Sequence, residues 1–280
     1  MGVFVMNRSA RIIWFMPSSS SAISIIVPTF REESNLDPLI HRVFAATSKA
    51  GIEAEMIIVD DNSQDGTCDI VENLAQRYPV QLVVRQKERG LASAVLAGFR
   101  KARYDRLVVM DADLQHPPEQ IPDLVQRLGE KDCDFVIGSR YVAGGGIAES
   151  WPWTLRLNSK VASWLARPLT PLSDPMSGFF ALHRKTWTEA DRLDPIGFKI
   201  GLELYVKGHC HQPAEIPIRF DTRVAGVSKS NWSERVRYLR HLFRLYRYRF
   251  PWRTGLATLA LLGGGLALLL SVLRLVRSGS

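Results

Sequence analysis

The chain has 280 residues, of which 46% are hydrophobic and 23% are charged. This length and composition predict one large folded domain with an appended segment, or two small domains, and they exclude a disordered protein. Three cysteines lie far apart without a CxxC spacing, which disfavours a disulfide framework and a cysteine-ligated zinc site. The net charge of +8 indicates an anionic partner, and its position along the chain decides which kind.

Residues 1–21 form an N-terminal tail in our domain assignment. Two short apolar clusters are separated by Arg8 and Arg11, and neither is long enough for a signal peptide. The serines at 18–21 are typical of a linker. We assign this tail no function.

Residues 22–230 alternate short apolar runs with helical patterns, and we assign them to one domain. We predict strands at 23–27, 56–59, 81–84, 107–110 and 135–137, and helices at 36–50, 66–78 and 90–102. Strands spaced in this way, with helices between them, predict an α/β fold with a doubly wound sheet. The ligands of such a sheet bind at the carboxyl ends of its strands.

Charged side chains follow several of these predicted strands. The acids are Glu32, Glu33, Asp60, Asp61, Asp111 and Asp113, and Arg140 follows the last strand. Carboxylates at one edge repel one another unless they hold a cation, a ribose or a base. The pair Asp111 and Asp113 is therefore a candidate clamp for Mg²⁺ or Mn²⁺, which prefer oxygen ligands and bridge to substrate phosphates. The absence of GxGxxG and GxxxxGK[ST] motifs disfavours dinucleotide dehydrogenases and P-loop NTPases.

Six segments of this region resemble a known family. They are SIIVPTFREESNL (24–36), IIVDDNSQDGT (57–67), ERGLASAVLAGFRKA (88–102), MDADLQHPPE (110–119), DFVIGSRY (134–141) and SDPMSGFFALHR (173–184). They resemble the inverting glycosyltransferases of family 2, and more narrowly the polyprenyl-phosphate or dolichyl-phosphate mannose synthase group. The resemblance covers about residues 23–230 and implies the GT-A nucleotide-sugar-binding fold, with a doubly wound, mixed and mostly parallel sheet.

The resemblance also implies roles for individual side chains. Contacts to the nucleotide base and ribose are implied for Pro28, Thr29, Glu32 and Asp61. The turn that meets the donor phosphates and the Mg²⁺ or Mn²⁺ ion is formed by Asp111, Ala112, Asp113 and Gln115, with Asp111, Asp113 and Gln115 as metal ligands. Basic groups around the diphosphate are Arg140, Lys199, Arg223 and Lys229. Groups that receive the acceptor phosphate are Arg156 and Ser159, so the catalytic set is Asp113, Arg140, Arg156 and Ser159. A structural ion pair for Arg140 and a solvated helix position for Lys199 are the alternatives.

The implied chemistry is displacement at the anomeric carbon of a sugar, with a nucleoside diphosphate as the leaving group. A divalent cation and basic side chains stabilise the charge that develops on that group. A lipid phosphate is already ionised near neutral pH, so this acceptor requires positioning but no general base. Glu203 is a nearby acid that could act as a base, and we favour a structural role for it. His116 could contact the metal, but Pro117 and Pro118 predict a turn there, and we leave His116 outside the site.

The positive charge is concentrated at the carboxyl-terminal end of the chain. Residues 231–280 contain a single acid, Glu234, and nine arginines: Arg235, Arg237, Arg240, Arg244, Arg247, Arg249, Arg253, Arg274 and Arg277. Within 231–253, apolar residues recur at helical spacing between the arginines, which predicts a basic amphipathic helix on an anionic membrane surface. A solvated helix that packs on the domain is the alternative for this segment. Residues 254–273 are uncharged and long enough to span a bilayer, so we predict a transmembrane helix at 254–276. A buried core helix and an insertion that turns at the glycines 263–265 are the alternatives.

This tail also predicts where the protein resides. Seven arginines precede the predicted span and two follow it, which places the catalytic domain on the cytoplasmic side. We therefore expect a single-pass protein of the cell membrane or an ER-type membrane. Its anionic partner is the lipid bilayer rather than nucleic acid, and a further membrane partner is left open.

Three functions remain as hypotheses. The preferred one is an inverting transferase that moves a hexose, with mannose from GDP-mannose favoured, onto polyprenyl or dolichyl monophosphate at the cytoplasmic membrane face. The second uses the same acceptor with a UDP-sugar such as UDP-glucose. The third is a non-catalytic membrane scaffold or sugar-nucleotide sensor. The complete set of Asp111, Asp113, Gln115 and Arg140 argues against the third.

Overall fold

The computed structural model describes residues 22–149, 151–194, 196–197, 199–221 and 232–252. A seven-stranded sheet with the order β3-β2-β1-β4-β7-β5-β8 forms its centre. The strands are β1 (Ile23–Thr29), β2 (Ala54–Asp60), β3 (Val80–Val84), β4 (Arg106–Val109), β5 (Phe135–Ser139), β7 (Phe180–His183) and β8 (Pro213–Pro217). Neighbouring strands are parallel except where β7 pairs with β4 and with β5. The predicted doubly wound, mixed and mostly parallel α/β sheet is confirmed.

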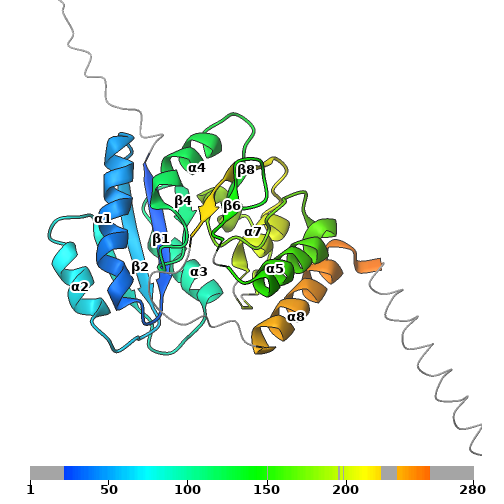
Figure 1. Cartoon of the computed structure of the whole chain (residues 1–280), viewed down its shortest axis with the longest axis horizontal. Helices are drawn as coiled ribbons and strands as arrows, with labels where there is room; N and C mark the ends of the chain where they lie inside the picture. The colour runs from blue at the N-terminus through cyan, green and yellow to red at the C-terminus, as the bar shows by residue number, and fades with distance from the viewer. Residues whose placement is uncertain (1–21, 150, 195, 198, 222–231, 253–280) are drawn as a thin grey trace, which may run out of the picture.

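Helices cover both faces of this sheet (Figure 1). One face packs against α1 (Glu33–Lys49), α2 (Thr67–Leu74) and α4 (Ile121–Leu128). The other face packs against α3 (Leu91–Lys101) and α7 (Ile200–Lys207). The alternation of side chains along β1 explains the two layers, because Ile25 and Val27 belong to the first apolar cluster and Ile26 to the second. The short helices are η2 (Pro118–Gln120), η3 (Arg167–Leu169) and α6 (Arg184–Thr188).

The five predicted strands and three predicted helices are all present, with limits that differ by a few residues. The antiparallel strand β7 was not predicted, and it lies between β4 and β5 in the sheet. A second, two-stranded sheet joins β6 (Gly146–Ile147) to β9 (Arg219–Phe220). This small sheet matters for the site, because Phe220 lines the cleft described below.

The helices α5 (Trp153–Ala166) and α8 (Trp232–Arg249) lie side by side at one end of the molecule (Figure 1). The hydroxyl groups of Tyr238 and Tyr246 donate hydrogen bonds to the carbonyls of Ala162 (2.6 Å) and Leu165 (2.7 Å). Leu242 of α8 is 4% exposed and belongs to the apolar cluster on that side of the sheet. A helix therefore occupies most of the predicted amphipathic segment 231–253, and one face of it is docked on the globular domain.

The predicted tail 1–21 and the predicted transmembrane helix 254–276 lie outside the described residues. Within the part of the chain that the structure describes, no helix combines the length and the apolar character that a membrane crossing requires. The domain limits at residues 22 and 230 stay predictions.

Candidate active site

A cleft of about 920 Å³ lies at the carboxyl ends of β1, β2 and β4. The parallel register explains why distant segments meet there, since the ends of these strands share one edge of the sheet. Most of the predicted site residues line this cleft: Pro28, Thr29, Glu32, Asp61, Asp111, Ala112, Asp113, Gln115, Arg140, Ser159 and Lys199.

Among the described residues, Arg156 is the predicted site residue that does not line the cleft. The guanidinium group of Arg156 donates hydrogen bonds to the carbonyls of Ala148 (2.8 Å), Glu149 (2.8 Å) and Trp151 (3.1 Å). Arg156 therefore fixes the loop that precedes α5. Arg223 and Lys229 lie outside the described residues.

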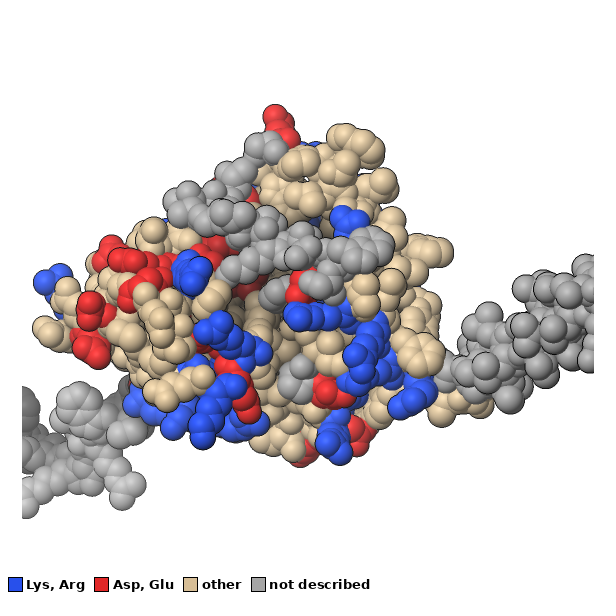
Figure 2. Space-filling model, turned by 90° about the horizontal axis from the view of Figure 1, so that it is seen from below, with Lys and Arg blue, Asp and Glu red and all other residues tan. Residues whose placement is uncertain are grey.

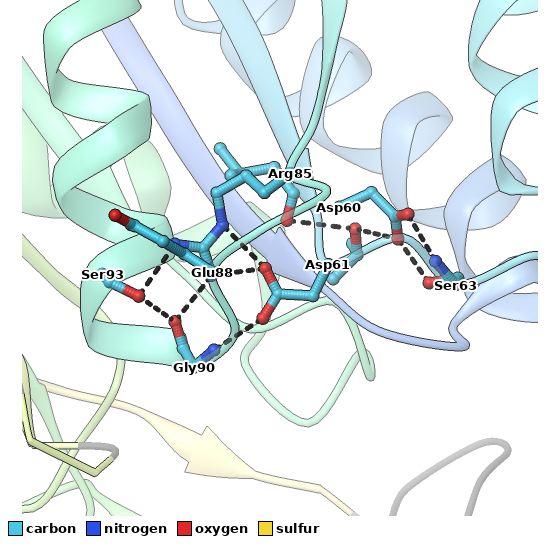
Figure 3. Close-up of polar contacts among 9 residues, drawn as sticks. Asp60, Asp61, Ser63, Arg85, Glu88, Gly90 and Ser93 are labelled. Carbon is cyan, nitrogen blue, oxygen red and sulfur yellow. Dashed lines mark hydrogen bonds and ion pairs between the residues drawn. The ribbon is translucent and has the colours of Figure 1, made fainter.

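Asp61, at the end of β2, has both carboxylate oxygens in hydrogen bonds (Figure 3). The Nε group of Arg85 donates to Oδ1 at 2.7 Å, the Nη2 group of Arg85 donates to the same oxygen, and the backbone N–H of Gly90 donates to Oδ2 at 2.7 Å. Arg85 also donates to the hydroxyl of Ser93 (2.8 Å) and to the carbonyl of Gly90 (3.0 Å). Arg85, which the sequence did not single out, thus joins Asp61 to the start of α3.

The neighbouring Asp60 is 1% exposed and has a separate function in the loop after β2. Its carboxylate accepts hydrogen bonds from the backbone N–H of Ser63 (2.8 Å), from the Ser63 hydroxyl and from the hydroxyl of Thr29 (3.3 Å). Asp60 therefore stabilises the turn, and Asp61 is the acid of this pair that reaches the cleft.

The turn after β4 brings Asp111, Asp113 and Gln115 into the same cleft. Leu114 adopts a positive φ of 61°, which reverses the chain between the last two. The Oδ1 atom of Asp113 accepts a hydrogen bond from the backbone N–H of Gln115 (3.1 Å). The side-chain amide of Gln115 donates to the carbonyl of Asp221 (3.0 Å), so its oxygen remains as a ligand atom.

This turn fits the oxygen ligands that Mg²⁺ and Mn²⁺ prefer. Gly178 allows the Asp111 carboxylate to approach the backbone closely, because a Cβ at that position would lie 2.9 Å from Oδ2. No cluster of three or more His, Cys, Asp or Glu ligands occurs within the described residues. An ion at this turn would therefore take two carboxylates and one amide oxygen, with donor phosphates and water completing its shell.

His116 follows this turn and is 2% exposed. The backbone N–H of Asp111 donates to its Nδ1 atom at 3.3 Å. The ring lies between Phe179, which stacks on it at 5.4 Å, and Phe220, whose ring centre lies 5.2 Å away. Burial lowers the pKa of His116 to about 4, although the nearby Asp113 favours the charged form.

Arg140, which lines the cleft, forms a buried, bidentate ion pair with Asp174. The guanidinium donates to the two carboxylate oxygens at 2.7 and 2.8 Å, and Asp174 is fully buried. The same guanidinium donates to the hydroxyl of Ser159 (3.2 Å), which also accepts a hydrogen bond from Tyr141 (2.8 Å). Arg140 therefore forms the structural ion pair that was the alternative prediction. It also lines the cleft, where the predicted binding role requires it to be.

Lys199 lies next to this pair, at the start of α7. Its ammonium group donates to the carbonyl of Met176 at 2.7 Å. Burial, together with the positive charge of Arg140, lowers its pKa. Both effects would be offset by an anion in the cleft, because the charged lysine would gain a counterion.

Toward α5 and α8 the lining of the cleft includes apolar side chains that the sequence did not predict. They are Leu155, Val161 and Leu165 from α5 and Tyr238 and Leu239 from α8, beside the polar Asn158, Glu234, Arg235 and His241. The cleft therefore changes along its length from carboxylates and basic groups at the sheet edge to a lining richer in hydrocarbon side chains between two helices.

Glu203 does not line the cleft, and its environment is that of a structural group. It is 2% exposed, and its carboxylate accepts hydrogen bonds from Lys207 (2.6 Å) and from the backbone N–H of Asp194 (2.8 Å). This placement agrees with the structural role that the sequence favoured over a general base.

Solved structures with a similar fold are those of a glycosyltransferase. Glucosyl-3-phosphoglycerate synthase from Mycobacterium tuberculosis, in complex with Mn²⁺, UDP and glucosyl-3-phosphoglycerate, gives a TM-score of 0.58 at 19% identity, covering 88% of this chain and 86% of that one. The same enzyme with Mg²⁺ and UDP gives a TM-score of 0.59 at 20% identity, covering 82% and 79%. This likeness defines the fold alone, which is the expected GT-A-like fold.

Sequence relatives are much closer than these structures. The model of the family described as "Glycosyl transferase family 2" matches residues 24–187. Proteins named dolichol-phosphate mannosyltransferase are 47% identical in Mycosarcoma maydis, 44% in Pyrococcus furiosus and 45% in Saccharomyces cerevisiae. The alignments cover 83%, 81% and 81% of this chain, and 82%, 64% and 88% of those relatives. The chain belongs to glycosyl transferase family 2, and it is an enzyme.

The Arg85→Met substitution tests the pairing with Asp61. We expect the free energy of unfolding in urea to fall by about 3–5 kcal/mol, because a buried carboxylate loses its cation. The double variant Arg85→Met, Asp61→Asn should recover most of this loss, since no unpaired charge remains. The control is Arg42→Met, which removes an exposed pair with Glu119 and should cost about 1 kcal/mol or less. Equal losses in the two single variants would contradict the assignment.

Proposed function

We propose that this enzyme transfers a mannosyl residue from GDP-mannose to dolichyl or another polyprenyl monophosphate, with inversion at the anomeric carbon. Three relatives with 44–47% identity over most of the chain carry the proposal, since each is named a dolichol-phosphate mannosyltransferase. The cleft supports it, because one cleft offers charged groups to a sugar nucleotide and an apolar wall to a lipid.

The donor occupies the sheet edge in this proposal. Pro28, Thr29, Glu32 and Asp61 contact the base and ribose. The turn of Asp111, Ala112, Asp113 and Gln115 faces the diphosphate, and Mg²⁺ or Mn²⁺ is held by Asp111, Asp113 and Gln115. This ion, when bound, neutralises charge on the diphosphate leaving group. Arg140 and Lys199, which also line the cleft, add positive charge, and we assign Arg223 and Lys229 to the same diphosphate.

The acceptor phosphate binds beside Arg140 and Ser159, whose side chains already contact each other (3.2 Å). An ionised phosphate needs no base to remove a proton, so these residues orient the nucleophile and neutralise part of its charge. Arg156 would have to release the loop carbonyls of residues 148–151 to reach this phosphate. The proposal therefore rests on Arg140 and Ser159 first, with Arg156 as a further contact.

The lipid tail of the acceptor follows the apolar side chains of the cleft toward α5 and α8. Beyond the cleft lining, these helices also expose large apolar side chains: Trp153, Leu157, Trp164, Val236 and Phe243, each at least 51% exposed. The arginines of α8 lie among them, and Figure 2 shows Lys and Arg side chains gathered on one face of the molecule. Apolar side chains with interspersed arginines fit the interface of an anionic bilayer.

We propose that this surface lies on the membrane, with segment 231–253 as the interface helix and 254–276 as a single transmembrane span. The catalytic domain is then cytoplasmic, as the arginine distribution predicts. Bringing the cleft to the bilayer avoids exposing the polyprenyl chain to water, which would cost about 0.8 kcal/mol for each CH₂ group.

A donor panel tests the proposed function. Purified protein is incubated with dolichyl or undecaprenyl phosphate, a divalent cation and labelled GDP-mannose, UDP-glucose or GDP-glucose. We expect label in the lipid fraction from GDP-mannose. Preferential transfer from UDP-glucose would replace the proposal with the UDP-sugar alternative, and no transfer from any donor would favour the scaffold or sensor.

Asp113→Ala tests the metal turn. We expect transfer to fall by a factor of about 10² or more, because one of the groups that neutralise the leaving diphosphate is lost. The melting temperature should change little, since Asp113 lines the cleft and its carboxylate accepts a hydrogen bond within its own turn, from the backbone N–H of Gln115. EDTA should abolish wild-type transfer, and added Mn²⁺ or Mg²⁺ should restore it. Near-full turnover of the variant would remove Asp113 from the site.

The double variant Trp153→Ser, Trp164→Ser tests the membrane surface. The two side chains are 72% and 69% exposed. We expect the KM for dolichyl phosphate in liposomes to rise by about tenfold or more, since each buried aromatic ring contributes roughly 1.5–3 kcal/mol, while the KM for the donor stays unchanged. Val84→Ser, an exposed apolar position on β3, is the control. An unchanged acceptor KM would contradict the proposed surface.

A further inference from the structure

The proposed function gives no role to His116, a buried polar ring in the wall of the cleft. His116 is 2% exposed and lines the cleft directly after Gln115. Buried polar groups in folded proteins have hydrogen-bond partners, and the identity of the partner indicates what the group does. Its partner is Asp111, the first residue of the metal turn.

The hydrogen bond fixes the form of the His116 ring. The backbone N–H of Asp111 donates to Nδ1 at 3.3 Å. A ring nitrogen that accepts a hydrogen bond carries no proton, so the imidazole is neutral and its proton is on Nε2. Nδ1 lies 3.6 Å from Oδ2 of Asp111 but has no proton to give it. His116 therefore holds the main chain of Asp111 without pairing with the carboxylate that a cation needs.

Aromatic packing fixes the position of the same ring. Phe179 stacks on it, and Phe220 contacts it edge-on. Phe220 in turn lies under the guanidinium of Arg140, 5.1 Å from the ring centre. His116 thus connects the turn that begins at Asp111 to Arg140 through Phe220.

The preceding residue anchors the turn to the same place. The amide of Gln115 donates to the carbonyl of Asp221 (3.0 Å), and the N–H of Asp221 donates to the carbonyl of Gln115 (3.1 Å). Residues 115 and 116 therefore dock together on residues 220 and 221. Two hydrogen bonds thus fix the turn that carries the three proposed oxygen ligands. One is from the backbone N–H of Asp111 to His116, and the other is from the side-chain amide of Gln115 to Asp221.

We propose that His116 is a positioning residue for the divalent cation, which acts by fixing Asp111 relative to Asp113 and Gln115. This inference rests on the proposed metal site at those three residues. Groups that orient metal ligands without touching the ion commonly change metal affinity by about 10- to 100-fold when they are replaced. His116 makes no contact with substrate in this role.

Two substitutions separate the Nδ1 contact from the bulk of the ring. In His116→Asn, the side-chain oxygen can take the place of Nδ1 and accept the Asp111 N–H. In His116→Gln, the longer side chain carries its oxygen nearer to the position of Nε2. Both variants lose the ring contacts with Phe179 and Phe220. They therefore differ mainly in whether the side-chain oxygen can accept the hydrogen bond from the backbone N–H of Asp111.

The readout is the affinity of the full-length protein for Mn²⁺ in the presence of GDP, measured from the electron paramagnetic resonance signal of free Mn²⁺. We expect His116→Asn to bind within about threefold of the wild type and His116→Gln to bind about 10- to 100-fold more weakly. The control is His183→Gln. His183 is half-buried at the end of β7 and lies next to Arg106, the first residue of β4, in the register of the sheet. This is the edge of the sheet opposite the cleft, so the substitution should leave Mn²⁺ affinity unchanged.

Several outcomes would overturn the role of His116. Wild-type affinity in His116→Gln would do so, and equal losses in the Asn and Gln variants would assign the effect to stacking instead. If the Gln variant does not fold, the role of His116 is still overturned by a folded Asn variant whose affinity for Mn²⁺ is tenfold or more below that of the wild type. A wild type that binds no Mn²⁺ with GDP or UDP removes the metal site and this role together. A wild type that binds Mn²⁺ as expected but transfers no sugar to lipid phosphate overturns the proposed function and leaves the role of His116 in place.

Discussion

The structure depends on the gathering of acidic side chains at one edge of a parallel sheet. Carboxylates brought together in this way repel one another, and each needs a compensating group. Asp61 is paired with Arg85, and Asp174 is paired with Arg140. The carboxylate of Asp111 has a third of its surface exposed and lines the cleft, where a cation can reach it. In the proposed function, the turn that carries Asp111 is where the cation binds.

Much of the fold could be predicted because its central strands are continuous apolar runs. β1, β2 and β5 are buried along their whole length, so their sequences are mostly apolar, as expected for strands covered on both faces. β7 and β8 could not be found in the same way. β7 has four residues and runs antiparallel between two strands that are distant in sequence, and β8 begins and ends with proline. The positions of β7 and β8 in the sheet depend on the neighbouring strands with which they form hydrogen bonds.

The sequence predicted which strand ends meet at the candidate site. It did not predict the contacts between individual side chains. Asp61 reaches the cleft as expected, yet two of its three hydrogen bonds come from Arg85, which is 24 residues away. Asp174 lies within a recognised segment, but nothing in its spacing indicates a pair with Arg140. Arg156 has a charge suited to a phosphate and instead binds three loop carbonyls. Pairing among several arginines and several acids is decided by tertiary packing, which a pattern along one chain does not contain.

The change in polarity along the cleft explains how one site can serve two substrates that do not mix. In the proposed function, a soluble and highly charged sugar nucleotide meets carboxylates, a cation and basic groups at the sheet edge. A polyprenyl phosphate has one charged end, and in the same proposal only that end reaches Arg140 and Ser159. Burial, and after it the positive charge of Arg140, lowers the pKa of Lys199 and so disfavours its charged form. A bound phosphate offsets both effects, so the same charges that are costly in the empty cleft favour the anions that the proposed reaction brings together.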